Sequence, residues 1–149
     1  MSALQRILYV EDEPDIQAVA LLALELLERG QPDAEALVRR HLQVSPQTPP
    51  GTPPVALTYA RILLDLQRYA DARSQLDAIT ASQPTLAEPW LLLATLQVQD
   101  NALPAATASL QNYMALARQA GDERSARGLT QAYLQMAQIA EKQNDFAAA

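Results

Sequence analysis

The stretch Tyr69-Ala70-Asp71-Ala72 has a counterpart in Leu103-Pro104-Ala105-Ala106, which places Ala72 and Ala106 thirty-four residues apart. A period of this length is typical of a solenoid built from helical hairpins. Because a single hairpin cannot bury its own apolar face, neighbouring hairpins stack and leave a continuous groove along the stack. The sequence around this repeat therefore predicts an interaction scaffold, and it leaves the bound molecule undefined.

The composition of the 149-residue chain agrees with a folded and largely helical protein. Hydrophobic residues make up 49% of the sequence, which is enough for a core. Only four glycines and one phenylalanine are present, and this usage favours helix over sheet. A formal net charge of −6 would repel a phosphate backbone, so nucleic-acid binding is disfavoured. The absence of cysteine from the sequence excludes disulfides and thiolate metal sites.

Two helices and a stiff connector are predicted in the first part of the chain. The apolar run at residues 7–10 is typical of a buried strand, and a helix predicted over residues 15–29 is ended by Gly30. A second helix is predicted over residues 33–44, antiparallel to the first. Five prolines and one glycine fall within residues 45–54, where they interrupt both helix and strand. We interpret that stretch as a linker rather than as a polyproline ligand.

Two further hairpins are predicted after the connector. The first has helices over residues 56–66 and 70–82. The second has helices over residues 89–98 and 104–119.

A longer helix is predicted to follow these hairpins. Asp122 is expected to cap it, Lys142 to lie at its end, and Gly128 inside it to cost about 1 kcal/mol relative to alanine. A final helix is predicted to start at Asp145. Its few residues cannot cover the face of the helix before it, so self-association through that uncovered helix is expected.

The small residues of these hairpins carry a resemblance to the tetratricopeptide repeat family over about residues 16–149. The matching positions are Ala60 and Ala94 in the first helices, Ala72 and Ala106 in the second helices, Pro84 at a unit boundary, Trp90, and Ala137 with residues 144–149 in a fourth unit. A degenerate first unit contributes Gly30, Pro46 and either Ala34 or Ala36. The resemblance implies an all-α fold, a right-handed α-solenoid of antiparallel helix hairpins with about three and a half repeats and a truncated C-terminal repeat. Ordinary helical hairpins without kinship to the family are the alternative.

The start of the chain carries a second resemblance. Ile7-Leu8-Tyr9-Val10-Glu11-Asp12-Glu13-Pro14-Asp15 resembles the first strand and acidic pair of a response-regulator receiver domain. By that resemblance Glu11 and Asp12 would help to hold Mg²⁺, and Asp65 would be the phosphoacceptor. The residues after Asp65 do not match the family's loop, and the only lysine is Lys142. We therefore interpret residues 1–15 as a receiver-like fragment that is neither an independent domain nor a functional site.

The repeat resemblance also implies a binding surface, because the first helix of each unit lines the concave face in that family. The residues placed there are Thr58, Arg61, Asp65, Thr95, Gln99, Gln135, Gln138 and Lys142. Most of them are neutral hydrogen-bonding side chains. The basic clamp with which some family members grip a carboxylate terminus is absent at the corresponding positions.

Enzyme chemistry finds little support in the sequence. The sole histidine, His41, lies among arginines on a predicted helix, and no glycine spacing matches a phosphate-binding loop. The acidic residues 11–15 are explained by a helix start, so no metal site and no cofactor are expected. The longest apolar run is too short to span a membrane, and acidic residues precede it, which predicts a cytoplasmic protein.

The leading hypothesis is therefore a nonenzymatic scaffold that binds a peptide or helix of a protein partner in the concave groove. One rival is a phosphoacceptor signalling module that uses Glu11, Asp12 and Asp65. The other rival is a chimeric or truncated chain that has no evolved function as a unit.

Overall fold

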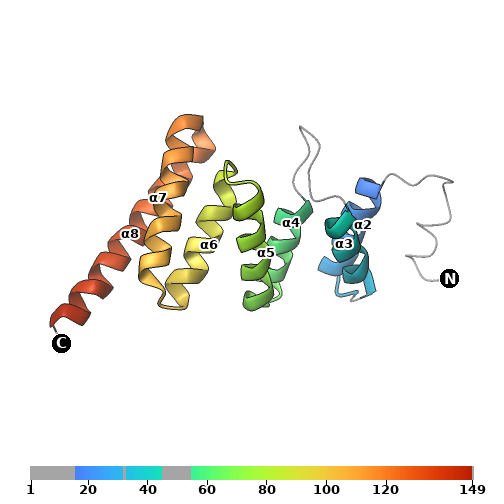
Figure 1. Ribbon diagram of the computed structural model, residues 1–149, viewed down its shortest axis with the longest axis horizontal. Coiled ribbons are helices and arrows are strands. Elements are labelled where there is room, and N and C mark those ends of the chain that lie inside the picture. The colour runs from blue at the N-terminus through green and yellow to red at the C-terminus, as the bar shows by residue number, and fades with distance from the viewer. Residues whose placement is uncertain (1–15, 32, 45–54, 149) are drawn as a thin grey trace. The chain divides into compact units, whose positions relative to one another are not determined.

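The computed structural model describes residues 16–31, 33–44 and 55–148, and within these ranges the regular structure is entirely α-helical (Figure 1). The helices are α2 (Ile16–Glu28), α3 (Asp33–Val44), α4 (Val55–Asp65), α5 (Tyr69–Ser82), α6 (Ala87–Gln99), α7 (Leu103–Ala120) and α8 (Glu123–Ala148). The prediction of an all-α fold made of antiparallel hairpins is confirmed. The predicted strand at residues 7–10, the pair Glu11 and Asp12, and the connector at residues 45–54 lie outside the described residues.

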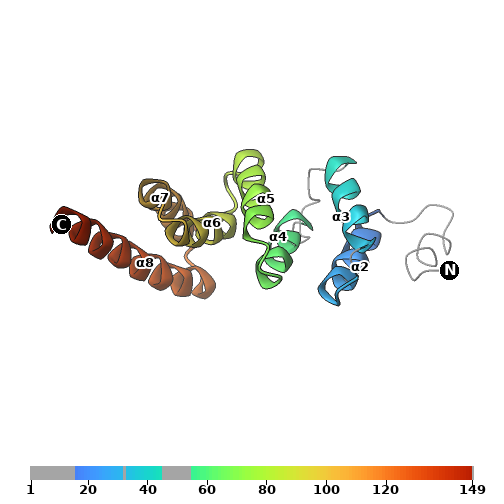
Figure 2. The same cartoon turned by 90° about the horizontal axis from the view of Figure 1, so that it is seen from below.

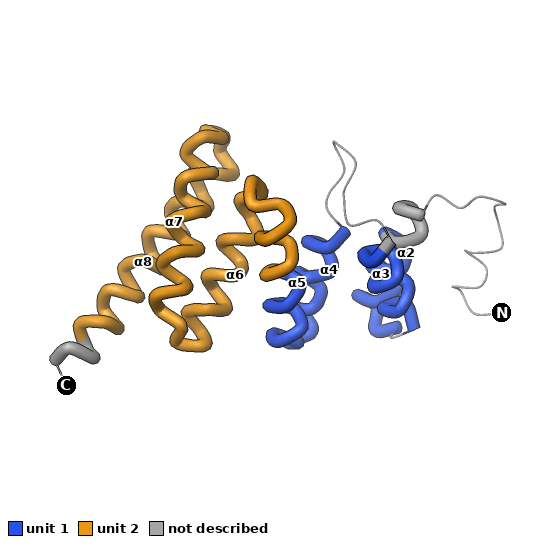
Figure 3. Tube along the Cα trace, viewed as in Figure 1, with its two compact units in different colours: residues 1–75 blue, residues 76–149 orange. Residues whose placement is uncertain are grey.

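The chain divides into two compact units, residues 1–75 and residues 76–149 (Figure 3). In the first unit α2 and α3 form a hairpin, and α4 packs against both of them. In the second unit α7 packs against both α6 and α8, and α6 also contacts α8. Figure 2 shows these three helices from below. The boundary falls within α5, so the first unit contains the complete helices α2, α3 and α4, the second contains α6, α7 and α8, and each holds a part of α5.

The turns of the three hairpins are built in the same way. Two positions after the last residue of each first helix comes a residue with left-handed backbone: Gly30 with φ 83°, Gln67 with φ 60° and Asn101 with φ 59°. The amide that follows each of these residues donates to a carbonyl five residues back, in the pairs Gln31 to Leu26 (3.0 Å), Arg68 to Leu63 (2.8 Å) and Ala102 to Gln97 (2.8 Å). This arrangement is the Schellman motif, which satisfies the last carbonyls of a helix. The first hairpin lacks the aromatic pattern of a repeat but shares its turn.

The small residues of the repeat pattern are fully buried. They are Ala60, Ala94, Ala72 and Ala106, each with a relative exposure of 0%. In the first hairpin Ala34 is buried and Ala36 is exposed, so the structure favours Ala34 as the small position. A methyl group at these places lets two helix backbones approach closely.

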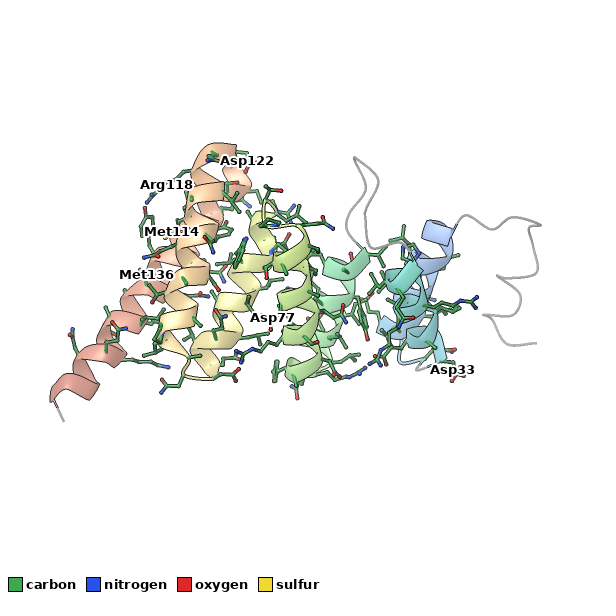
Figure 4. All side chains as sticks on the ribbon, viewed as in Figure 1. Asp33, Asp77, Met114, Arg118, Asp122 and Met136 are labelled. Atoms are coloured by element: carbon green, nitrogen blue, oxygen red, sulfur yellow. The ribbon has the colours of Figure 1, made fainter. Side chains whose placement is uncertain are left out.

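The core of the second unit joins all three of its complete helices. Its buried residues are Ala94, Leu103, Ala106, Leu110, Tyr113, Ala117, Ala132 and Ile139. Met114 of α7 and Met136 of α8 pack against this cluster (Figure 4). At the entrance to α6 the indole Nε1 of Trp90 donates to the carbonyl of Pro84 at 3.0 Å, which fixes the turn before α6.

Gly128 has a packing role that the sequence did not reveal. The ring of Tyr113 on α7 lies against the backbone of α8 at this glycine, and a Cβ built there would clash with the Tyr113 hydroxyl and lie 2.7 Å from Cζ. The glycine therefore makes room for the buried Tyr113 ring, so its low helix propensity is offset by tight packing between α7 and α8.

The start of α8 agrees with the prediction and its end does not. Gly121 adopts φ 64° after α7, and Asp122 Oδ1 accepts the Ser125 backbone N–H at 2.7 Å as an N-cap (Figure 4). The predicted end at Lys142 and the predicted new helix at Asp145 are wrong, because α8 continues without interruption to residue 148. Residues 141–148 contain neither glycine nor proline, and alanines follow at its end, so local propensity favours continuation.

Candidate functional site

The predicted groove residues lie on three first helices. Thr58, Arg61 and Asp65 lie on α4, Thr95 and Gln99 on α6, and Gln135, Gln138 and Lys142 on α8. Spacings of three, four and seven residues keep each set along one side of its helix. The α4 set belongs to the first unit and the other two sets to the second unit, so they are two separate groups.

In the second unit, polar contacts align α6 with α8. Gln135 Nε2 donates to Thr95 Oγ1 at 2.8 Å, and the Thr95 hydroxyl donates to the Leu91 carbonyl at 3.0 Å. Towards the start of both helices, Arg124 forms an ion pair with Glu88 at 3.3 Å. The partners advance together along the two helices, so α6 and α8 run parallel. The structure therefore brings two of the predicted groove residues, Thr95 and Gln135, into direct contact.

This contact changes the role expected of Gln135. Its side chain is buried, with a relative exposure of 9%, so it holds α8 in register with α6 and is not an accessible ligand contact. Gln99, Gln138 and Lys142 are exposed. We call these three residues the amide strip. They carry two carboxamides, each both donor and acceptor, and one ammonium donor.

The α4 set of the first unit is less accessible. Thr58 and Arg61 are half-buried, and Asp65 is exposed at the last position of the helix. The receiver resemblance requires a strand before the phosphoacceptor, but residues 55–65 form α4. Asp65 therefore lies at a helix end and lacks the strand context of the receiver family.

A polar network in the first unit was missed by the sequence reasoning. The Glu35 carboxylate on α3 accepts hydrogen bonds from the Tyr59 hydroxyl on α4, from Arg68 Nη1 at 2.9 Å and from Arg39 Nη2 at 2.9 Å. Arg68, in the turn after α4, also pairs with Asp71 at 2.7 Å. Because Glu35 and Arg68 are thirty-three residues apart, no local spacing could have revealed this network.

The surroundings of Glu35 strongly favour its charged form. Hydrogen bonding from Arg68 lowers the pKa of Glu35 from 4.5 to about 2, although burial acts in the opposite direction. Burial and the Glu35 carboxylate raise the pKa of the Tyr59 hydroxyl, so it stays protonated and acts as a donor. The network connects α3 to α4 and to the turn after it, and we interpret it as a clamp that fixes the first hairpin.

Other chemistry is sparse in the part of the chain that the structure describes. Within residues 16–31, 33–44 and 55–148, no group of three or more His, Asp or Glu side chains is arranged to hold a metal ion. His41 is half-buried on α3. No helix among the described residues is both long enough and apolar enough to span a membrane.

These features define a fold class. Antiparallel hairpins with a shared left-handed turn, buried small residues at helix contacts and a thirty-four-residue period are those of an all-α helical-hairpin repeat fold of the tetratricopeptide-like kind.

Comparison with solved structures supports this class. Two structures of MamA, a point mutant and the protein labelled AMB-1, each match with a TM-score of 0.57 and 19% identity over 97% of this chain, and over 80% and 81% of theirs. MamA 41-end from Desulfovibrio magneticus RS-1 matches with a TM-score of 0.51 and 18% identity over 83% of this chain and 77% of its own. No protein-family model matches the sequence, and neither does any curated protein. At so low an identity, the structural likeness shows a shared fold and no more.

Proposed function

We propose that the protein is a nonenzymatic scaffold for protein–protein interaction, which binds an extended segment or helix of a protein partner along the first helices of its hairpins. One observation carries this proposal: α6 and α8 run parallel, the Thr95–Gln135 hydrogen bond fixes their register, and the amide strip stays exposed beside that bond. A rigid pair of helices with exposed polar side chains can bind a ligand without paying to order itself.

The chemistry of the strip favours a peptide. Carboxamides such as Gln99 and Gln138 can donate to a peptide carbonyl and accept from a peptide amide, so they suit a backbone in extended or helical form. Lys142 adds one positive charge and favours a partner with an acidic side chain nearby. The net charge of −6 weakens the competing case for nucleic acid.

The binding surface can be tested with a random peptide library displayed on phage. Peptides selected on the full chain are measured by isothermal titration against Gln99→Glu and Lys142→Glu variants. Because an acidic group replaces a donor at an exposed position, we expect each variant to weaken binding by about tenfold. The matched control is Gln111→Glu, the same chemical change at an exposed position on α7.

The α4 set is tested separately by Arg61→Glu, with circular dichroism to confirm that the variant folds. Selected peptides that bind all three groove variants and the control equally well would refute the assignment. A library that yields no binder to the wild-type chain would refute the peptide-binding proposal itself.

A further inference from the structure

The outer face of α8 is the most exposed apolar surface in the described part of the chain. On this helix Leu134 has a relative exposure of 62% and Tyr133 of 51%, above the other large apolar residues described. The helix buries its opposite side against α6 and α7 through Ala132, Gln135 and Ile139. The adjacent Tyr133 and Leu134 side chains therefore form an apolar surface that is available for contact.

The residues around Leu134 suit close contact with another helix. The outer face contains Ala126, Thr130, Leu134, Ala137 and Glu141, which recur at three or four residues, and Tyr133 beside Leu134; all six are exposed. Alanine and threonine beside a single leucine let a second backbone approach closely. Tyr133 accepts a hydrogen bond from Arg118 on α7 at 2.7 Å, so its ring is held at the edge of this face.

The charges on this face identify the occupant. Arg127 lies seven residues before Leu134 and Glu141 lies seven residues after it, and both are exposed. Seven residues are two turns of helix, about 10 Å, so the charges lie on the same side as the leucine. A second α8 that crosses antiparallel at Leu134 would place its Glu141 opposite Arg127 and its Arg127 opposite Glu141. A parallel pair would instead place like charges opposite each other.

We propose that the outer face of α8 is a homotypic interface, at which a second copy of this chain docks its own α8 antiparallel across a two-fold axis at Leu134. Arg127 forms an ion pair with Glu123 within α8, and its side chain is 79% exposed. Its guanidinium can therefore donate to a second carboxylate. This inference does not depend on the peptide-binding proposal, because its residues are not those of the amide strip.

Sedimentation equilibrium of the full chain over a range of micromolar concentrations provides the first test. We expect reversible association from the 16.2 kDa monomer to a species of twice that mass. Leu134→Glu places two carboxylates against each other at the two-fold axis, and we expect it to weaken association by about a hundredfold or more. Leu22→Glu is the matched control, since Leu22 is also an exposed leucine but lies on α2.

Charge reversal tests the antiparallel register. Arg127→Glu and Glu141→Arg each replace attraction by repulsion at both symmetric pairs, and each should weaken association by about tenfold. The double variant Arg127→Glu/Glu141→Arg restores both pairs with inverted sign and should recover association close to that of the wild type. These variants keep Leu134, so they stay informative if Leu134→Glu is poorly folded.

Cysteine crosslinking gives a second measure of the register, because the natural sequence has no cysteine. Leu134→Cys should form a disulfide with its own copy on mild oxidation. Arg127→Cys and Glu141→Cys should crosslink efficiently only when the two variants are mixed. A wild-type chain that stays monomeric at every concentration, association that survives Leu134→Glu, or a double charge variant no better than the single ones would each overturn the proposal.

Discussion

Replacing Glu35 by glutamine is predicted to weaken the attachment of the first hairpin to α4. Glutamine keeps the shape of the side chain and an oxygen that can accept from Tyr59. It removes the negative charge that Arg68 and Arg39 both contact at 2.9 Å. The change therefore isolates the charge of the clamp from its packing.

The size of the effect follows from the pKa of Glu35. The carboxyl has a pKa of about 2 in the folded protein, against an ordinary value of 4.5. At about 1.4 kcal/mol for each unit of pKa, this difference corresponds to about 3 kcal/mol of stability. Glu35 is only 17% exposed, but its partner Arg39 is 55% exposed, and screening by water at that end reduces the expected loss to about 2 kcal/mol.

The stabilisation that the Glu35 carboxylate contributes decreases at low pH. The folded protein holds Glu35 ionised at a lower pH than the unfolded chain does, so the unfolded state binds more protons between pH 4.5 and about 2. The stabilisation is therefore complete above about pH 4.5 and is lost as the pH falls towards 2. The glutamine variant lacks this component, so its deficit relative to the wild type should shrink in that same interval.

Urea denaturation followed by far-UV circular dichroism, at pH values from 7 down to 3, measures the stability lost in Glu35→Gln and the dependence of that loss on pH. The control is Glu25→Gln in the same unit, which removes an exposed ion pair between Glu25 on α2 and Arg29, the residue that follows this helix. Such surface pairs contribute at most about 0.5 kcal/mol, so the control should unfold almost like the wild type. The reasoning would be refuted by a Glu35→Gln variant as stable as that control at pH 7, or by a deficit that stays constant with pH.

Two further predictions concern backbone positions. Gly128→Ala should destabilise the protein by about 1–2 kcal/mol despite alanine's better helix propensity, because its methyl group meets the Tyr113 ring. The same change in a Tyr113→Ala background should be neutral or stabilising in thermal denaturation, and an equal cost in both backgrounds would contradict the packing argument. Gln67→Gly should raise stability by about 0.5 kcal/mol by relieving its left-handed backbone. Asn101→Gly should be nearly neutral, since asparagine tolerates that conformation, and an equal gain at both turns would argue against this explanation.

Much of the fold could be predicted because its signals are local. The turn at Gly30 and the cap at Asp122 are each set by a few neighbouring residues, and the structure agrees at both places. The small positions Ala72 and Ala106 follow from a fixed period in the sequence, and both are buried. The end of α8 was mispredicted, because a new helix was expected to start at Asp145, directly after Asn144, whereas α8 continues through both residues. An asparagine permits a left-handed turn and does not require one, and the surrounding residues favour helix.

The side-chain contacts were much less predictable. The clamp on Glu35 and the Tyr113 ring over Gly128 depend on residues from different helices, and their geometry exists only after packing. Of the residues that the repeat resemblance placed in the groove, Thr95 and Gln135 contact each other in the structure. Sequence spacing could not show that the Gln135 side chain is buried in this hydrogen bond, because its burial depends on the neighbouring helix α6.

The structure makes the two proposed surfaces separable even though α8 contributes to both. Gln99 belongs to α6 and Leu134 to the outer face of α8, so neither variant removes a residue of the other surface. The core contacts of Ala132 and Ile139, together with the Thr95–Gln135 bond, hold α8 in place whichever surface is occupied. A ligand at one site alters the affinity at another only if the protein has two conformations that bind the ligands differently. A helix α8 that keeps one position provides no second conformation. Gln99→Glu should therefore change peptide affinity and leave the association constant unaltered, whereas Leu134→Glu should do the reverse. A peptide that shifts the association constant would show instead that α8 moves between two positions, with the Thr95–Gln135 bond the first contact expected to differ between them.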